Sequence, residues 1–117
     1  MEIGKMPSGW KVFFSTAAAY NLVIGGLAWA APDAPLMNRV VGLLVLCFGI
    51  IYCLVAREPA RFAPALWAGV VGKVGVVAML SPGVMDGSLP PETGPVLVGD
   101  FLFTLGFLAF LWRRRRD

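Results

Sequence analysis

A stretch of 17 residues without a charge, VVGLLVLCFGIIYCLVA at residues 40–56, decides the fold of this chain. Similar apolar stretches occupy residues 12–31, 62–85 and 95–112, and residues 36–38 extend the second one outward. A membrane-spanning helix needs about 20 mostly apolar residues, since each adds about 1.5 Å. The alternating pattern of a membrane β-barrel is absent. The sequence therefore predicts an all-α protein with four transmembrane helices, at about residues 12–31, 36–56, 62–85 and 95–112.

The composition excludes several classes of protein. Hydrophobic residues make up 58% of the 117 residues and charged residues 15%, whereas soluble domains have about 45–50% and about 25%. A disordered chain is excluded as well, because it would have far less apolar surface. With no histidine and two cysteines, the chain has almost no material for a histidine metal site, a catalytic triad or a disulfide framework. We predict neither catalytic nor metal-binding residues.

Prolines mark the predicted ends of the helices. Pro35 and Pro95 stand at the starts of spans, where a missing N–H costs nothing. Glu58 precedes Pro59 and should end the second span, and Pro82 should end or kink the third. The connections, of about four, five and ten residues, are short enough to make successive helices antiparallel neighbours. We therefore expect one domain, residues 1–117, folded as an antiparallel four-helix bundle.

The distribution of lysine and arginine predicts the orientation of the chain in the membrane. One side of the predicted bundle has eight basic residues: Lys5, Lys11, Arg57, Arg61, Arg113, Arg114, Arg115 and Arg116. The other side has only Arg39, together with three acidic residues, Asp33, Asp86 and Glu92. Because basic residues accumulate on the cytoplasmic side, both termini should be cytoplasmic. Three tryptophans support the span ends, since Trp10, Trp29 and Trp112 stand where an aromatic belt is expected.

The start of the chain allows one competing interpretation. Two lysines, an apolar stretch and then Ala28-Trp29-Ala30 imitate a secretory signal with its cleavage site. The apolar stretch is longer than the core of a usual signal peptide. We therefore expect the first span to be retained.

Two charged residues inside the spans are the strongest candidates for a functional site. Lys73 lies 12 residues after Arg61, and Asp100 lies 13 before Arg113, so both should sit about 18–20 Å from the same surface. A charge at this depth costs about 2.5–3.5 kcal/mol and usually faces the bundle interior with a partner. Lys73 and Asp100 are expected either to pair structurally or to form a site for proton transfer or for a polar headgroup or ligand.

Other polar and small residues allow similar pairs of interpretations. Asn21 should lie about 15 Å deep and could join Lys73 and Asp100 in a ligand site, or bond between helices. Glycines at 69, 72 and 75, with Ala65 and Ala68, make a small-residue face that favours close helix packing over a cofactor passage. Cys47 and Cys53 are six residues apart, too far for a disulfide within one helix, and should pack as small apolar residues.

The basic flanks favour binding to anionic lipid headgroups. We expect this role for six arginines, namely Arg57, Arg61, Arg113, Arg114, Arg115 and Arg116. The last four could alternatively form a docking patch for a cytoplasmic partner. Nucleic acid is not expected as a partner, because no basic face exists outside the membrane flanks.

Several short motifs occur in a recognisable order: YNLVIGG at residues 20–26, FGIIY at 48–52, REPAR at 57–61, GK at 72–73 and GD at 99–100. On these motifs the chain resembles the DoxX-like group of small four-helix bacterial membrane proteins. The resemblance implies a bacterial inner-membrane bundle, and some members are associated with quinone-linked sulfur oxidation or oxidative stress. It carries over no catalytic residues. Small multidrug exporters have a similar length, but their membrane-embedded glutamate in the first helix is missing here, where only Asn21 stands.

Three functions are compatible with these features. The first is a non-enzymatic accessory or structural subunit that packs against other subunits of a respiratory or photosynthetic membrane complex. The second is a protein that binds a quinone or other small molecule at Lys73, Asp100 and Asn21. The third is a small homodimeric transporter. The sequence requires no cofactor, although a quinone or pigment could reach the chain through a partner.

Overall fold

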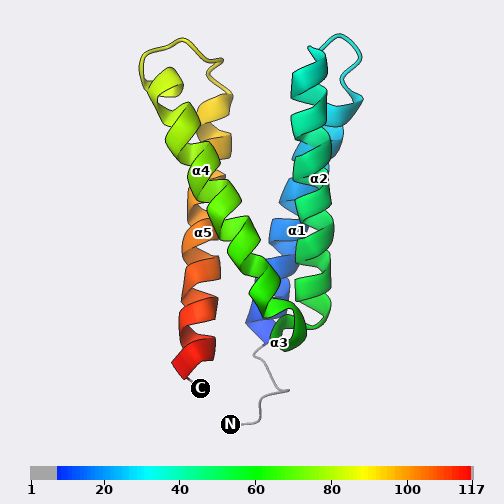
Figure 1. Cartoon of the computed structure of the whole chain (residues 1–117), viewed down its shortest axis with the longest axis vertical. Helices are drawn as coiled ribbons and strands as arrows, with labels where there is room; N and C mark the ends of the chain where they lie inside the picture. The colour runs from blue at the N-terminus through cyan, green and yellow to red at the C-terminus, as the bar shows by residue number, and fades with distance from the viewer. Residues whose placement is uncertain (1–7, 117) are drawn as a thin grey trace. The chain divides into compact units, whose positions relative to one another are not determined.

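The computed structural model describes residues 8–116, and side chains from residue 9 to residue 113. The elements, in chain order, are α1 (Ser8–Ala30), α2 (Leu36–Arg57), α3 (Pro59–Phe62), the 3-10 turn η1 (Ala63–Ala65), α4 (Leu66–Met85) and α5 (Thr93–Arg116) (Figure 1). The described residues thus confirm the all-α class.

Four helical segments in the described part of the chain are long and apolar enough to cross a membrane. They are Gly9–Ala30, Leu36–Arg57, Pro59–Met85 and Thr93–Arg113, close to the four predicted spans. About a third or less of each segment is buried within the chain. Many large apolar side chains are exposed instead, among them Leu27, Leu36, Met79, Leu102 and Trp112. Four such segments indicate a multi-pass membrane protein whose exposed apolar surface suits hydrocarbon.

The chain divides into two compact units, one ending at Ala65 and the other beginning at Leu66. Each contains an antiparallel pair of long helices, α1 with α2 and α4 with α5 (Figure 1). The short connections predicted these pairings. Each unit is thus a helical hairpin of its own.

Glycines set the contact between α1 and α2. A Cβ added to Gly42 would lie 2.6 Å from the Cβ of Ala28, and one added to Gly49 would lie 2.9 Å from the Leu22 side chain. A Cβ on Gly25 would meet the backbone of Leu46 and would lie 2.7 Å from the carbonyl oxygen of Gly42. The two backbones therefore approach closely at three places, as small residues permit in membrane helices.

The connection between α1 and α2 is held by an arginine. The Nε of Arg39, in the first turn of α2, donates to the carbonyl oxygen of Trp29 at 2.8 Å. That carbonyl belongs to the last turn of α1, where helix carbonyls lack partners and carry partial negative charge. Arg39 is the one basic residue that the sequence assigned to the outer side, and the structure gives it this capping role.

Proline ends α2 as predicted. Glu58 has φ −140° and ψ 75°, an extended conformation of the kind favoured before proline. The chain then re-enters a helix at once, because Pro59 starts α3. The predicted five-residue loop is wrong: only Glu58 separates α2 from α3. Proline at the first helical position loses no hydrogen bond, which explains the short link.

The second hairpin differs from the prediction at Pro82. This proline lies inside α4, which continues to Met85. Of the two outcomes predicted at Pro82, an end of the helix is therefore wrong, and α4 ends where the predicted span 62–85 ends. The turn comes after Met85. The Leu89 N–H donates to the Gly83 carbonyl oxygen at 3.1 Å, and Gly87 has a positive φ of 81°. This left-handed glycine lets the chain reverse after α4.

Candidate functional site

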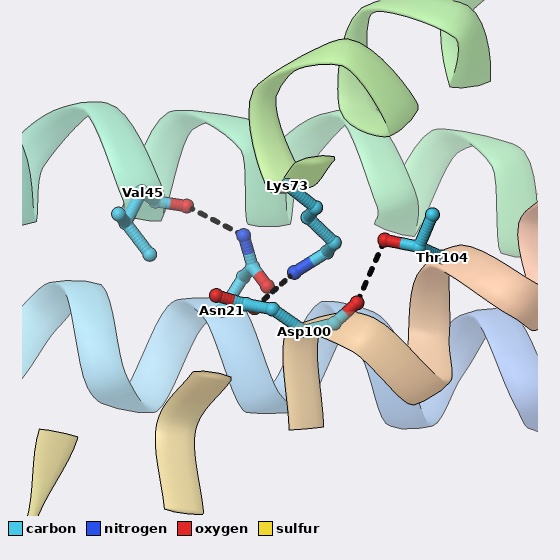
Figure 2. A network of polar contacts seen from close by, with 5 residues as sticks. All are labelled: Asn21, Val45, Lys73, Asp100 and Thr104. Carbon is cyan, nitrogen blue, oxygen red and sulfur yellow. Dashed lines mark hydrogen bonds and ion pairs between the residues drawn. The ribbon is translucent and has the colours of Figure 1, made fainter. Parts of the chain in front are cut away.

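Lys73 of α4 and Asp100 of α5 contact each other directly. The Nζ of Lys73 lies 2.7 Å from Oδ1 of Asp100, and Figure 2 shows the two side chains pointing toward each other. The two side chains are only 7% and 12% exposed. Lys73 lies 12 residues before the end of α4 at Met85, and Asp100 lies 7 residues after the start of α5 at Thr93. The antiparallel course of α4 and α5 brings the two side chains into contact. Their predicted equal depth is thus matched by a charge-assisted hydrogen bond.

An aromatic ring and a hydroxyl lie beside this ion pair. The ammonium group of Lys73 is 5.8 Å from the centroid of the Phe103 ring, within the range of a cation–π interaction. The Thr104 hydroxyl donates to the backbone carbonyl oxygen of Asp100 at 2.7 Å (Figure 2), a local bond within α5. Phe103 was not among the candidate residues predicted from the sequence. Its spacing of three residues from Asp100, one helical turn, is the signal that could have found it.

Asn21 makes a different contact, within the first hairpin. Its Nδ2 donates to the carbonyl oxygen of Val45 at 3.2 Å, linking α1 to α2 (Figure 2). The Asn21 residue is 5% exposed. The three residues predicted as one candidate site are therefore found in two polar contacts, one in each hairpin. Lys73 and Asp100 are brought together, and the described hydrogen bond of Asn21 is the interhelical one that the alternative interpretation expected.

Two of the three glycines in the predicted small-residue face of α4 are not packed against another helix, whereas Gly69 is buried. A Cβ added to Gly72 or to Gly75 would have no atom within 4 Å. This contrasts with Gly25, Gly42 and Gly49, each of which is needed for a close contact. The glycines at 72 and 75 therefore do not serve a close contact between α4 and α5.

The remaining candidate residues are the two cysteines and a tyrosine. Cys47 is exposed and Cys53 half-buried, and both are free thiols. Among the described residues, no group of three or more histidine, cysteine, aspartate or glutamate side chains is placed to hold a metal ion. Tyr52 is fully buried, and the centroid of its ring lies 6.4 Å from that of Phe48.

Four of the basic residues that the structure describes are exposed near the ends of helices. Lys11, Arg57, Arg61 and Arg113 are all exposed. Arg61 also pairs with Glu58 at 3.5 Å and lies 5.0 Å from the Phe62 ring. The backbone of α5 continues through Arg116, but the side chains of Arg114, Arg115 and Arg116, and all of Lys5, lie outside the described parts.

No family model, no curated protein and no solved structure matches this chain.

Proposed function

We propose that this protein is a non-enzymatic accessory subunit of a larger complex in the bacterial inner membrane, folded as a four-helix bundle with both termini in the cytoplasm. It would bind its partner through α4. Its contribution would be to fill and stabilise a helix interface rather than to carry out a reaction.

The observation that carries this proposal is the unused space at Gly72 and Gly75. Ala68 precedes them by one turn, and Ala68, Val71 and Met79 are exposed on the same side of α4. Residues 68, 72, 75 and 79 follow the i, i+4, i+7 and i+11 spacing of one helix face. In a bilayer, small residues on one face allow another helix to approach closely. A partner helix with larger side chains would fit against this surface, which we call the α4 glycine face.

The ion pair supports a structural rather than a reactive role. Lys73 and Asp100 are the charged residues in the interior of the four spans, and they neutralise each other at 2.7 Å. A catalytic acid or base needs a proton that it can exchange with a substrate. A lysine bonded to an aspartate at short distance instead ties α4 to α5.

The proposed orientation is supported by the charges of each hairpin taken separately. In the first, Lys11, Arg57 and Arg61 lie at the end opposite the α1–α2 connection, and Arg39 is bonded to a backbone carbonyl. In the second, arginines follow Trp112, whereas Asp86 and Glu92 lie in the α4–α5 connection. Both hairpins thus carry their basic residues at the end that should face the cytoplasm.

The test is a gentle affinity purification of the tagged chain from its native membrane, followed by mass spectrometry. The wild-type chain should retain a fixed set of larger membrane subunits. Gly72→Leu combined with Gly75→Leu should remove them, because the added side chains would occupy the α4 glycine face. Helix content should stay normal, since a Cβ added at either position has no atom within 4 Å.

A matched control uses the same kind of substitution elsewhere. Ala109 is a small exposed residue on α5, so Ala109→Leu should leave the partners bound. Retention of the partners by the double glycine variant would contradict the proposed interface. A wild-type chain that purifies without any partner would contradict the accessory role itself.

A second candidate is binding of a quinone or another small molecule beside Lys73 and Asp100, as similarity to the DoxX-like group would imply. The observation that favours it is the Phe103 ring, 5.8 Å from the lysine ammonium, which places an aromatic surface beside a polar pair. Here Lys73→Met should abolish retention of extracted quinone while the helices stay folded. Undiminished quinone in that variant would exclude this candidate.

A further inference from the structure

The motif Ala28-Trp29-Ala30, which resembles a signal-peptidase site, forms the end of α1. The bond that such a peptidase would cut joins Ala30 to Ala31. Helix α1 stops at Ala30, and Pro32 in the α1–α2 connection is exposed. The chain after the bond therefore lies in the kind of exposed connection that proteases reach.

The helical conformation of the motif hides it from a peptidase. Its two alanines are two residues apart, and side chains at this spacing point to the same side of an extended chain. In a helix they lie about 200° apart around the axis. Ala30 is accordingly exposed, whereas Ala28 faces α2, where a Cβ on Gly42 would lie 2.6 Å from its own Cβ. Both alanines can be recognised together only after the last turn of α1 has unwound.

The sequence just before the motif does not favour a helix by itself. Gly25 and Gly26 are consecutive, and glycine is the least favourable residue of a helix interior apart from proline. Among the four candidate spans, the one formed by α1 is also the least apolar. The helical state of residues 27–30 therefore depends on packing against α2 rather than on local preference.

Two contacts from α2 hold the last turn of α1. A Cβ on Gly42 would lie 2.5 Å from the backbone nitrogen of Trp29, so this glycine lets the backbone of α2 lie directly against the motif. Arg39 donates through Nε to the Trp29 carbonyl oxygen at 2.8 Å. A peptidase has to extend the chain at Trp29, which requires both contacts to open.

We propose that Ala28-Trp29-Ala30 is a signal-peptidase site that α2 keeps closed. While α2 is packed, the chain keeps its first span. When α2 is not packed, the last turn of α1 unwinds and the peptidase hydrolyses the Ala30–Ala31 bond with water, leaving a carboxylate on Ala30 and an amino group on Ala31. Cleavage thereby marks chains whose first hairpin has not formed. The proposal rests on the proposed orientation, which puts this end of α1 on the outer side where signal peptidases act, and it does not depend on the accessory role.

The test compares full-length tagged variants expressed in bacterial cells, with the first residue of the purified chain determined by mass spectrometry. The wild-type chain should remain almost entirely intact. In Gly42→Ala the product that begins at Ala31 should increase about tenfold or more, because the added Cβ meets the Trp29 backbone and cleavage follows the population of the open form. A Gly42→Ala chain that does not fold should be cut as well. An intact Gly42→Ala chain would overturn the proposal.

Gly26→Ala is the matched control, since a Cβ there would lie 3.7 Å from the Leu46 side chain, an ordinary contact. This variant should remain intact. Cutting of Gly26→Ala to the same extent as Gly42→Ala would show that the contact with α2 does not close the site, and would overturn the proposal.

Arg39→Gln tests the second contact. It removes the guanidinium group that bonds to Trp29 and should raise the cut fraction about fivefold, the factor expected for one hydrogen bond. Removal of a basic residue from the outer side also leaves the orientation favoured. Combined with Gly42→Ala it should increase cleavage further, and a combined variant that stays intact would overturn the proposal.

Ala30→Leu tests the motif itself. Ala30 is exposed, so a larger side chain leaves the contact with α2 in place, but a signal peptidase requires a small residue there. Added to Gly42→Ala, this change should prevent cleavage. Cutting that persists would come from a different protease and would overturn the assignment.

A cysteine at Asp33, with Cys47 and Cys53 changed to Ser, separates failure of the site from failure of the orientation. Labelling of this cysteine by an impermeant maleimide from outside, while Gly42→Ala stays intact, would contradict the closed site alone. Labelling only after the membrane is permeabilised would contradict the proposed orientation and the site with it.

Discussion

At the scale of single residues, the Lys73–Asp100 pair is the feature with the clearest energetic consequence. Both side chains are nearly buried, and their charged atoms are 2.7 Å apart. Removal of one partner leaves the other charge buried and unpaired, which costs about 3–5 kcal/mol, while an apolar pair of similar volume costs little. Lys73→Met alone and Asp100→Leu alone should therefore each destabilise the protein by about 3 kcal/mol, and the combination should be close to wild type.

The measurement is reversible unfolding of the four proteins in the same lipid discs, followed by the circular dichroism of the helices. Thr104→Val is a useful comparison, because it removes only the local bond of Thr104 to the Asp100 carbonyl oxygen and should cost about 1 kcal/mol or less. Additive losses in the double variant would show that the two charges do not stabilise each other.

The Lys73–Asp100 pair could be predicted because each residue of a helix adds the same rise. The number of residues between a basic anchor and a second residue therefore gives the depth of that residue in the membrane. The group that accepts the hydrogen bond of the Asn21 side chain could not be predicted. That acceptor is the backbone carbonyl of Val45, and every residue carries a carbonyl, so no residue type marks it. The absence of a close helix contact at Gly72 and Gly75 could not be predicted for a related reason. A glycine shows that close approach is possible but does not show which helix, if any, makes it.

At the scale of elements, the contact between α1 and α2 depends on individual glycines. Gly25→Ala places a Cβ against the backbone of Leu46 and 2.7 Å from the Gly42 carbonyl oxygen. Because a backbone cannot move aside as a flexible side chain can, the two helices must separate, and we expect a loss of about 2 kcal/mol or more in unfolding free energy. The adjacent Gly26 provides the matched control.

A Cβ on Gly26 would lie 3.7 Å from the Leu46 side chain, an ordinary contact. Gly26→Ala should therefore be neutral or slightly stabilising, since alanine favours the helix by up to about 1 kcal/mol. Unfolding of the two variants in lipid discs compares them directly. Equal stability of Gly25→Ala and Gly26→Ala would contradict the close approach of α1 and α2.

The turn after α4 should respond to acid. The hydroxyl and the backbone N–H of Ser88 lower the pKa of the exposed Asp86 carboxyl below its ordinary value of 3.8, the N–H donating to Oδ1 at 2.9 Å. Because the pKa is lower in the folded turn than in the unfolded chain, the carboxylate stabilises the turn above pH 3.8 and this stabilisation disappears as the pH falls through the folded value.

Amide exchange at Ser88, expressed as protection relative to the unfolded rate, measures this effect. Protection should be constant near neutral pH and fall once the pH drops below about 3.8. In Asp86→Asn no carboxyl titrates, so the protection should no longer change over this range. Identical acid profiles for the two proteins would show that the Asp86 carboxylate does not hold the turn.

The prolines show what a sequence can say about helix ends. Glu58 takes an extended conformation before Pro59 because the proline ring clashes with a helical residue before it, and that effect is local. Pro82 is tolerated inside α4, since in membranes the side chains nearby can satisfy the freed backbone groups. The carbonyl that loses its helical donor at Pro82 is that of Ala78, and beside it the Ser81 hydroxyl donates to the Val77 carbonyl oxygen, a local bond within α4. The same residue type therefore ended one helix and not the other.

At the scale of the whole molecule, the charges of both hairpins lead to one prediction about orientation. With Cys47 and Cys53 changed to Ser, a single cysteine is introduced at Asp33, Asp86 or Asp117. A membrane-impermeant maleimide should label the first two in intact spheroplasts, and the third only after the membrane is permeabilised, because basic residues remain in the cytoplasm. The opposite labelling pattern would invert the proposed topology.

The length and apolar character of the four spans were predictable, because the thickness of the hydrocarbon core sets them. It was harder to predict from the sequence which surfaces of the spans contact another helix and which face lipid. Much of the surface of every span is apolar and exposed, and in lipid such a surface does not by itself specify a neighbour. Among the described residues, the open space at Gly72 and Gly75 is the feature on which we base the proposed contact surface.

The most direct test of the accessory role is the mass and composition of the undisturbed particle. The tagged chain is extracted from its native membrane within a polymer-bounded lipid disc and examined by native mass spectrometry. We predict a particle in which the 12.5 kDa chain accompanies at least one different membrane subunit in a fixed ratio. A particle containing only this chain and lipid would contradict the accessory role.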